Sequence, residues 1–265
     1  MAKEVKTLKE TLRNAQGRFL RAITGAYKAT ATEALEIETL IEPLDIYIEK
    51  TATTGIVRQV LDGYNKKIRL LGQNLALRTR GKRGRKRKAP PFYHEKTLKW
   101  LKTHQNIDIH DLLEKFKEKN EFWKHFKRSR EEQNLAKWRE RWKKSDKGRT
   151  IAGYRPYPTK EAPKLYKDRS KAFRSILIGL RTGKLGLQAF LLKMRVPGYE
   201  DPRCQNCQQN TEETVKHFIL ECPKWESYRE DILGPYKDKS LKDTLNSRIG
   251  SKKAVEFLWT TKRLD

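Results

Sequence analysis

The chain has 265 residues, of which 36% are hydrophobic and 35% charged, and its formal net charge is +27. This basic surplus predicts a polyanionic partner, RNA or DNA. The first residues lack the apolar segment of a secretory signal, and no apolar run approaches the roughly 20 residues that span a bilayer. We therefore expect no membrane association and a reducing compartment.

The N-terminal part is predicted to form a helical module over residues 1–77. Residues 1–60 carry 9 basic and 8 acidic residues, so the positive charge is concentrated in the rest of the chain. Apolar residues recur at helical spacing over residues 5–27, where Gly25 supplies a stop. A second helix is expected from near Thr32 to before Pro43, and a further apolar stretch follows it. We expect the apolar positions of all these helices to form the core.

A basic, glycine-punctuated run occupies the predicted linker over residues 78–94. Like charges at this density repel one another and resist folding. The run fits a phosphate-binding arm, a nuclear localisation signal or both, and a passive linker is the alternative. We predict that it contacts nucleic acid through the side chains of Lys82, Arg83, Arg85, Lys86, Arg87 and Lys88.

The middle of the chain, residues 95–148, is predicted to be a basic helical region. Trp138 and Trp142 lie four residues apart on one helix face, in a stretch rich in Lys and Arg. Such a pair can stack on single-stranded bases, but a packing stripe with solvated charges opposite is the more common arrangement. Proline and tyrosine are frequent in residues 149–169, which we predict to be an extended connector.

The C-terminal part, residues 170–265, is predicted to be a second helical module. A helix is expected from near Ser170, an interruption around Gly183, and another helix through residues 185–194. Pro197 and Gly198 end this second helix and lead into a segment rich in cysteine. The predicted fold class is therefore mainly α, with two helical modules joined by a basic linker and helix.

All three cysteines of the chain lie within residues 204–222, together with one histidine. They form the array C-x2-C-x9-H-x4-C, which consists of Cys204, Cys207, His217 and Cys222. Three thiolates and one imidazole are a typical tetrahedral zinc site, and an odd number of cysteines does not suit a disulfide framework. Three buried thiols that cluster without a metal are the alternative. Because four protein ligands would close the coordination shell, the predicted Zn²⁺ site is structural.

The spacing between His217 and Cys222 constrains the local structure. On one straight α-helix, residues five positions apart point in well-separated directions. The short helix expected over residues 212–220 should therefore end near Leu220 or Glu221. Pro223 supports this end, because it disfavours the helical conformation at Cys222 and suits the first turn of a following helix.

Several segments around the array resemble the C-terminal end of fungal non-LTR (LINE-type) retrotransposon polyproteins. The resemblance lies in Leu180–Leu191, in Val196-Pro197, in the array itself with Cys222-Pro223, and in the tail Ala254–Leu264. The stretch from Gln16 to Pro43-Leu44 is similar to the region between polymerase and ribonuclease H in the same polyproteins. The resemblance implies metal binding by the Cys-Cys-His-Cys residues.

Departures from that family concern the catalytic parts. No Asp-Asp pair occurs in the chain, whereas a polymerase palm carries paired aspartates for two magnesium ions. Residues 60–135 are too short and too basic for a ribonuclease H domain. The remaining histidines are accompanied by no nucleophile, Gly-rich phosphate loop or carboxylate cluster. We therefore predict that the protein is not an enzyme.

Two classes of function remain open. The first is a non-catalytic nucleic-acid-binding protein in the nucleus, derived from a retrotransposon polyprotein as a relic or a domesticated piece. The second is a protein-interaction scaffold or assembly factor in an RNA-rich setting, with protein partners at the C-terminal module. An accessory fragment of a reverse transcriptase and a degenerate element without selected function are further alternatives.

Overall fold

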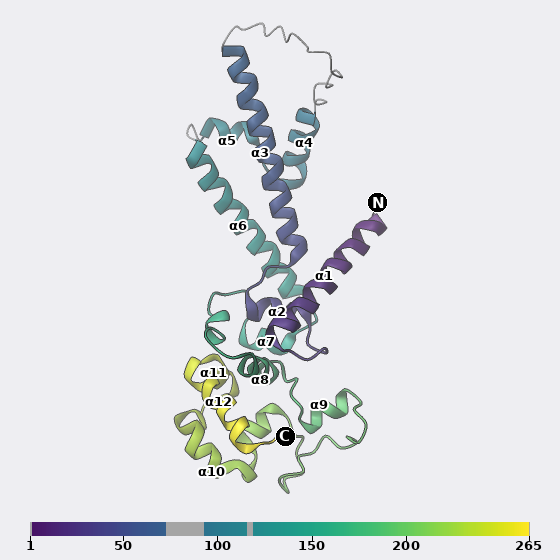
Figure 1. Cartoon of the computed structure of the whole chain (residues 1–265), viewed down its shortest axis with the longest axis vertical. Coiled ribbons are helices and arrows are strands. Elements are labelled where there is room, and N and C mark those ends of the chain that lie inside the picture. The colour runs from purple at the N-terminus through teal and green to yellow at the C-terminus, as the bar shows by residue number, and fades with distance from the viewer. Residues whose placement is uncertain (1, 73–92, 116–118, 265) are drawn as a thin grey trace. The chain divides into compact units, whose positions relative to one another are not determined.

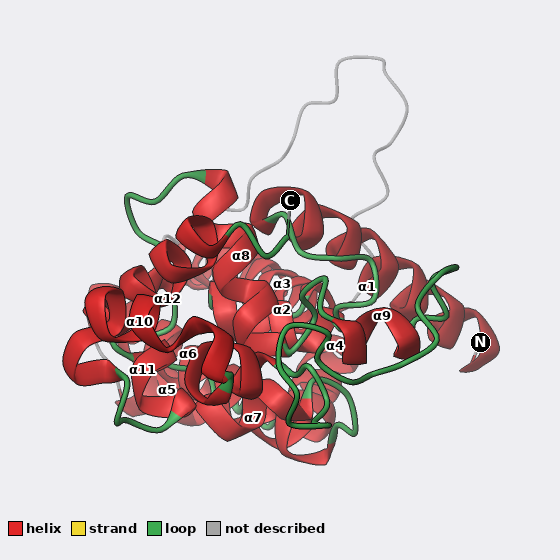
Figure 2. Cartoon of the chain, turned by 90° about the horizontal axis from the view of Figure 1, so that it is seen from below, coloured by secondary structure: helices red, strands yellow, loops and turns green. Residues whose placement is uncertain are grey.

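The computed structural model describes residues 2–72, 93–115 and 119–264, and within these ranges it is mainly helical and contains no β-strand (Figures 1 and 2). This confirms the predicted fold class. The six basic residues predicted to contact nucleic acid, 82–88, lie outside the described residues. None of the helices in the described ranges is long and apolar enough to cross a membrane.

Figure 1 labels the α-helices in chain order. The α-helices are α1 Ala2–Thr24, α2 Thr32–Thr39, α3 Leu44–Gly72, α4 Tyr93–Gln105, α5 Ile109–Lys115, α6 Lys119–Lys144, α7 Arg149–Tyr154, α8 Lys171–Thr182, α9 Gln188–Lys193, α10 Glu226–Tyr228, α11 Leu241–Asn246 and α12 Arg248–Thr261. Short 3-10 turns span Pro163–Leu165, Pro223–Trp225 and Gly234–Tyr236, and π-helical turns span His217–Glu221 and Arg229–Leu233.

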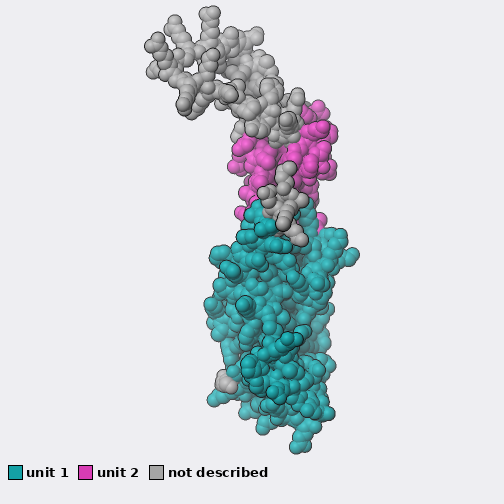
Figure 3. Space-filling view, turned by 90° about the vertical axis from the view of Figure 1, so that its right-hand side faces the viewer, with its two compact units in different colours: residues 1–45, 137–265 teal, residues 46–136 magenta. Residues whose placement is uncertain are grey.

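The chain forms two compact units, which Figure 3 colours separately. Unit 1 combines residues 1–45 with residues 137–265, and unit 2 consists of residues 46–136. The segments that build unit 1 are thus far apart in sequence. Each unit has a hydrophobic core of its own.

The core of unit 2 is aliphatic and aromatic. Phe122 and Phe126 stack with ring centroids 5.9 Å apart, and Trp123 meets Phe122 edge-on at 5.3 Å. Offset-stacked and edge-to-face pairs are the favourable geometries for aromatic rings. These rings pack with other buried side chains, which are Val57, Val60, Leu61, Leu101, Ile107 and Ile109. Phe122 and Phe126 are therefore core residues of unit 2.

Within unit 1, a buried ion pair links α2 to α8. Arg181 and Glu38 are fully buried, and the guanidinium donates to both carboxylate oxygens at 2.8 and 3.0 Å. Arg181 also donates to the Leu245 carbonyl oxygen at 2.8 Å, while the Tyr166 hydroxyl donates to Glu38. A buried pair of charges is tolerated only when its remaining hydrogen-bonding groups are also satisfied, as they are for this guanidinium.

Trp138 and Trp142 of α6 are core residues. Trp138 is 5% exposed and Trp142 is 2% exposed. The Trp142 indole donates to the Arg155 carbonyl oxygen at 3.0 Å, and the Arg149 guanidinium lies 4.9 Å from the Trp142 ring. The packing interpretation of this pair is therefore confirmed.

Two local expectations are wrong. Residues 149–169 are not an extended connector throughout, because α7 and the turn Pro163–Leu165 lie within them and bury Ile151 and Leu165. Not all apolar positions of α1 belong to a core, because Leu8, Phe19 and Ile23 are 59%, 68% and 49% exposed. The buried face of α1 carries small and polar residues together with Leu20, and Gly17 there lies against the Thr32 side chain.

Candidate metal centre

The four side chains of the Cys-Cys-His-Cys array converge on one point in unit 1. Their ligand atoms all lie within 4.8 Å of one another. Cys204, His217 and Cys222 are buried, and Cys207 is half-buried. The grouping predicted from the spacing is therefore present in the fold.

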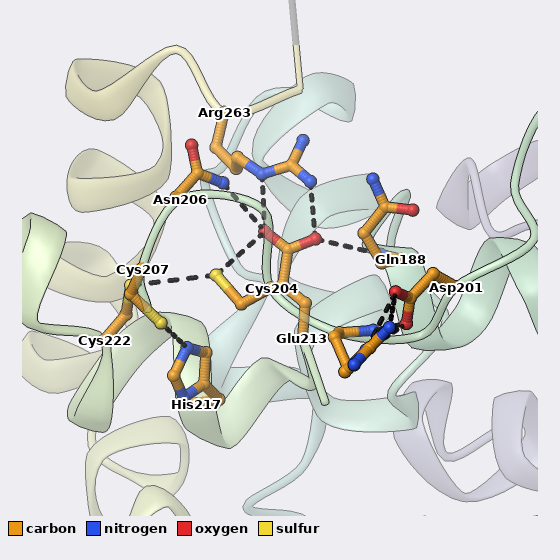
Figure 4. Close-up of polar contacts among 10 residues, drawn as sticks. Gln188, Asp201, Cys204, Asn206, Cys207, Glu213, His217, Cys222 and Arg263 are labelled. Carbon is orange, nitrogen blue, oxygen red and sulfur yellow. Dashed lines mark hydrogen bonds and ion pairs between the residues drawn. The ribbon is translucent and has the colours of Figure 1, made fainter. Parts of the chain in front are cut away.

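The distances between donor atoms fit one tetrahedral ion. With bonds of about 2.3 Å to sulfur and 2.05 Å to nitrogen, two sulfurs should lie about 3.8 Å apart, and a sulfur and a nitrogen about 3.6 Å apart. The Cys204 and Cys222 Sγ atoms are 3.9 Å apart, and Cys207 Sγ lies 3.4 Å from His217 Nε2 (Figure 4). The donor set and its spacing thus suit a four-coordinate metal, with His217 binding through Nε2.

A tight loop presents the first two cysteines. The Cys204 amide donates to the Thr211 carbonyl oxygen at 2.8 Å, and the Glu213 amide donates to the Pro202 carbonyl oxygen at 2.8 Å. The loop therefore turns back on itself after Cys207, with an isolated antiparallel bridge between Arg203 and Glu212. This return brings both thiols close to the helical turn that follows.

A π-helical turn presents the other two ligands. It spans His217–Glu221, and the Cys222 amide donates to the His217 carbonyl oxygen at 2.7 Å. A hydrogen bond over five residues widens the turn, so that positions 217 and 222 lie on the same side of it. Cys222 leaves the helix with an extended backbone, and Pro223 begins the next turn, so the predicted helix end at Glu221 is confirmed.

The protonation of the thiols reflects their burial. The pKa of Cys222 is raised to about 12, chiefly by burial and also by the neighbouring Cys204 and Cys207 thiols, although a hydrogen bond from the Lys224 amide acts in the opposite direction. Burial also raises the pKa of Cys204. Thiols of this kind keep their protons at neutral pH unless a cation replaces them, so metal binding would release protons.

The Glu213 carboxylate holds the cysteine loop in place through hydrogen bonds. Its side chain is buried and accepts hydrogen bonds from Arg263 at 2.5 and 2.6 Å and from the Gln188 amide at 2.9 Å (Figure 4). The Asn206 side chain donates to the same carboxylate at 3.3 Å, and Cys204 Sγ lies 4.0 Å from it. This carboxylate thus ties the cysteine loop to the start of α9 and to the end of the chain beyond α12.

Arg229 and Phe218 hold the π-helical turn. The Arg229 guanidinium donates to the carbonyl oxygens of Ile219 at 3.1 Å and Cys222 at 2.5 Å. Phe218 is buried against Phe257 of α12, with ring centroids 5.3 Å apart. The turn is therefore packed on the last helix and does not depend on the ligands alone for its position.

Sequence reasoning missed the roles of Glu213, Arg263 and Arg229. Glu213 lies inside the array and Arg263 lies 50 residues later, so spacing carries no signal for their pairing. Comparisons with models of protein families, with curated proteins and with solved structures find no match for the chain.

Proposed function

We propose that the protein is a non-catalytic nucleic-acid-binding protein whose C-terminal region is stabilised by a structural Zn²⁺ ion. The observation that carries the proposal is the closed set of four ligands, Cys204, Cys207, His217 and Cys222, in a chain with a net charge of +27. Four protein ligands leave no coordination position for a substrate or an activated water, which distinguishes structural from catalytic zinc sites.

Zinc is the ion that this donor set favours. Three thiolates and an imidazole in tetrahedral array select a borderline-soft ion without a geometric preference of its own. When bound, the ion would supply cross-linking between the cysteine loop and the π-helical turn. The thiols, Glu213 and Arg229 would then hold the segment that leads into the last helices.

The origin and location of the protein are part of the same proposal. The resemblance of the array and its flanks to LINE-type polyproteins supports derivation from a retrotransposon, with the binding parts kept and the catalytic parts lost. The basic run over residues 78–94 supports a nuclear location and contact with RNA or DNA phosphates through residues 82–88.

Zinc content and salt-dependent binding test the proposal together. We expect one zinc ion per purified chain by elemental analysis, and loss of the ion in the variant Cys204→Ser. We also expect fluorescence anisotropy with labelled RNA and DNA to show affinity that falls steeply as salt rises, because cations on the protein release counterions from the phosphates.

A flat salt response, or no binding to either nucleic acid, would exclude this function. In that case, capture of protein partners that survives nuclease treatment would favour an interaction scaffold. Retention of a stable C-terminal region without any metal in Cys204→Ser would exclude the structural role of zinc.

A further inference from the structure

A large groove lies in unit 1 beside the candidate metal centre. Its volume is about 930 Å³, near the upper end of the roughly 300–1,000 Å³ that is common for ligand sites. It is lined by α1, by the loop before α2, by the start of α7, by the turn between α8 and α9, and by residues 212–215. Residues that are distant in sequence thus form one continuous concave surface.

The groove carries more cations than carboxylates. Seven of its lining residues are Lys or Arg and four are Glu. Of the four carboxylates, Glu33 pairs with Arg13 and Glu213 pairs with Arg263, so two are already neutralised. The side chains of Lys28, Lys147 and Lys193 are exposed and form no ion pair with any residue in the described ranges. An excess of unpaired positive charge in a concave surface attracts polyanions.

Lys184 lies among these cations. Burial lowers the pKa of Lys184, and the nearby charge of Lys193 lowers it further. An anion in the groove would relieve this repulsion between like charges.

Two polar groups in the groove wall lack partners. The Thr30 hydroxyl and the Nε atom of Arg21 are buried and have no hydrogen-bond partner among the described residues. Buried polar groups in folded proteins are nearly always hydrogen-bonded, so such groups indicate a ligand or solvent.

Aromatic rings adjoin the cations. Phe190 lines the groove, and the half-exposed Tyr27 lies beside it with ring centroids 5.8 Å apart. The Lys184 ammonium is 5.7 Å from the centre of the Phe190 ring. A basic groove with aromatic rings along it is the arrangement that binds single-stranded nucleic acids, because the cations track phosphates while the rings stack on bases.

We propose that this groove binds a single-stranded nucleic acid, with its phosphates at Lys28, Lys147, Lys184 and Lys193 and a base against Tyr27 or Phe190. The inference rests on the proposed function and places the contact in unit 1, at residues other than 82–88. Residues 212–215 form one wall and are separated from His217 by a single residue, so the metal centre would hold that wall in place.

The test compares two triple variants with equal change in charge. K28Q/K147Q/K193Q removes three groove cations, and K160Q/K242Q/K252Q removes three exposed lysines that do not line the groove. Each phosphate contact on a single strand contributes about 0.7 to the slope of log affinity against log salt. We expect the groove variant to lose on the order of tenfold in affinity for single-stranded RNA or DNA and about 2 in slope, and the control to change little.

Further measurements separate this inference from the proposed function. Ultraviolet cross-linking of a thiouridine-containing RNA to the wild type should modify peptides that contain Tyr27 or Phe190. If the two triple variants lose equal affinity, or if only neutralising residues 82–88 weakens binding, the groove is not the site although the protein binds nucleic acid. Absence of nucleic-acid binding by the wild type would exclude both proposals. Displacement of bound RNA by a poly-glutamate peptide at equal charge concentration would favour an acidic protein as the ligand of the groove.

Discussion

Replacing Glu36 by Gln should stabilise unit 1 at neutral and alkaline pH. Glu36 of α2 is 2% exposed, and its Oε1 atom has no hydrogen-bond partner in the described part of the chain. The pKa of this carboxyl is raised from 4.5 to about 7, chiefly by burial. Arg141 and Arg13 lower the pKa and Asp45 raises it, and the net shift remains upward.

The direction of the pH effect follows from this shift. Below pH 4.5 the carboxyl is neutral in both states, so its burial carries no charge penalty. Between pH 4.5 and about 7 the unfolded chain ionises first, and the folded state loses stability relative to it as the pH rises. A shift of about 2.5 units at about 1.36 kcal/mol each corresponds to a loss of about 3 kcal/mol, complete above pH 7. The amide of Gln cannot ionise and should remove this loss.

Urea unfolding between pH 5 and 8, followed by tryptophan fluorescence, measures the effect. The free energy of unfolding of E36Q should exceed that of the wild type by an amount that grows with pH to about 3 kcal/mol. Glu140 provides a control of opposite sign, because its hydrogen bond and ion pair with Lys144 lower its pKa. E140Q should therefore be less stable than the wild type at neutral pH and approach it in acid. Parallel pH profiles for E36Q and the wild type would refute the reasoning.

Three further perturbations address the metal centre and the core. Cys204→Ser should abolish stoichiometric zinc and make the C-terminal region sensitive to limited proteolysis, and unchanged digestion would contradict this. Arg181→Met should lower the free energy of unfolding, measured in urea, by about 3 to 5 kcal/mol, because it leaves the Glu38 carboxylate buried without a counter-charge. The double variant that also carries Glu38→Gln should recover part of this loss of stability. Ser170→Ala removes the hydroxyl that accepts a hydrogen bond from the Phe173 amide at the start of α8, and it should lower the free energy of unfolding by about 1 kcal/mol. A thermal midpoint equal to that of the wild type would exclude a capping role for Ser170.

Features determined by neighbouring residues could be predicted from the sequence. Gly25 and Gly183 follow the last residues of α1 and α8 with φ values of +73° and +68°, a conformation that glycine adopts without strain. The four metal ligands lie within nineteen residues, so a tight loop and one helical turn are sufficient to bring them together.

Features that depend on distant residues could not be predicted. Glu213 meets Arg263 across 50 residues, and Glu38 meets Arg181 across 143. Helical periodicity indicates which residues share a face of a helix, but it does not identify the element that packs against that face. For this reason the periodicity predicted that Phe19 belongs to a core, although its side chain is exposed. The groove combines five separate segments and therefore has no signature in any one of them.

The separation between Glu38 and Arg181 has a consequence for biosynthesis. A ribosome that adds about 5 to 20 residues per second needs about 7 to 30 s to translate the 143 positions between them. During that interval α2 has been made but its partner on α8 does not exist. The first segment of unit 1 must therefore remain without its α8 partner while all of unit 2 is made.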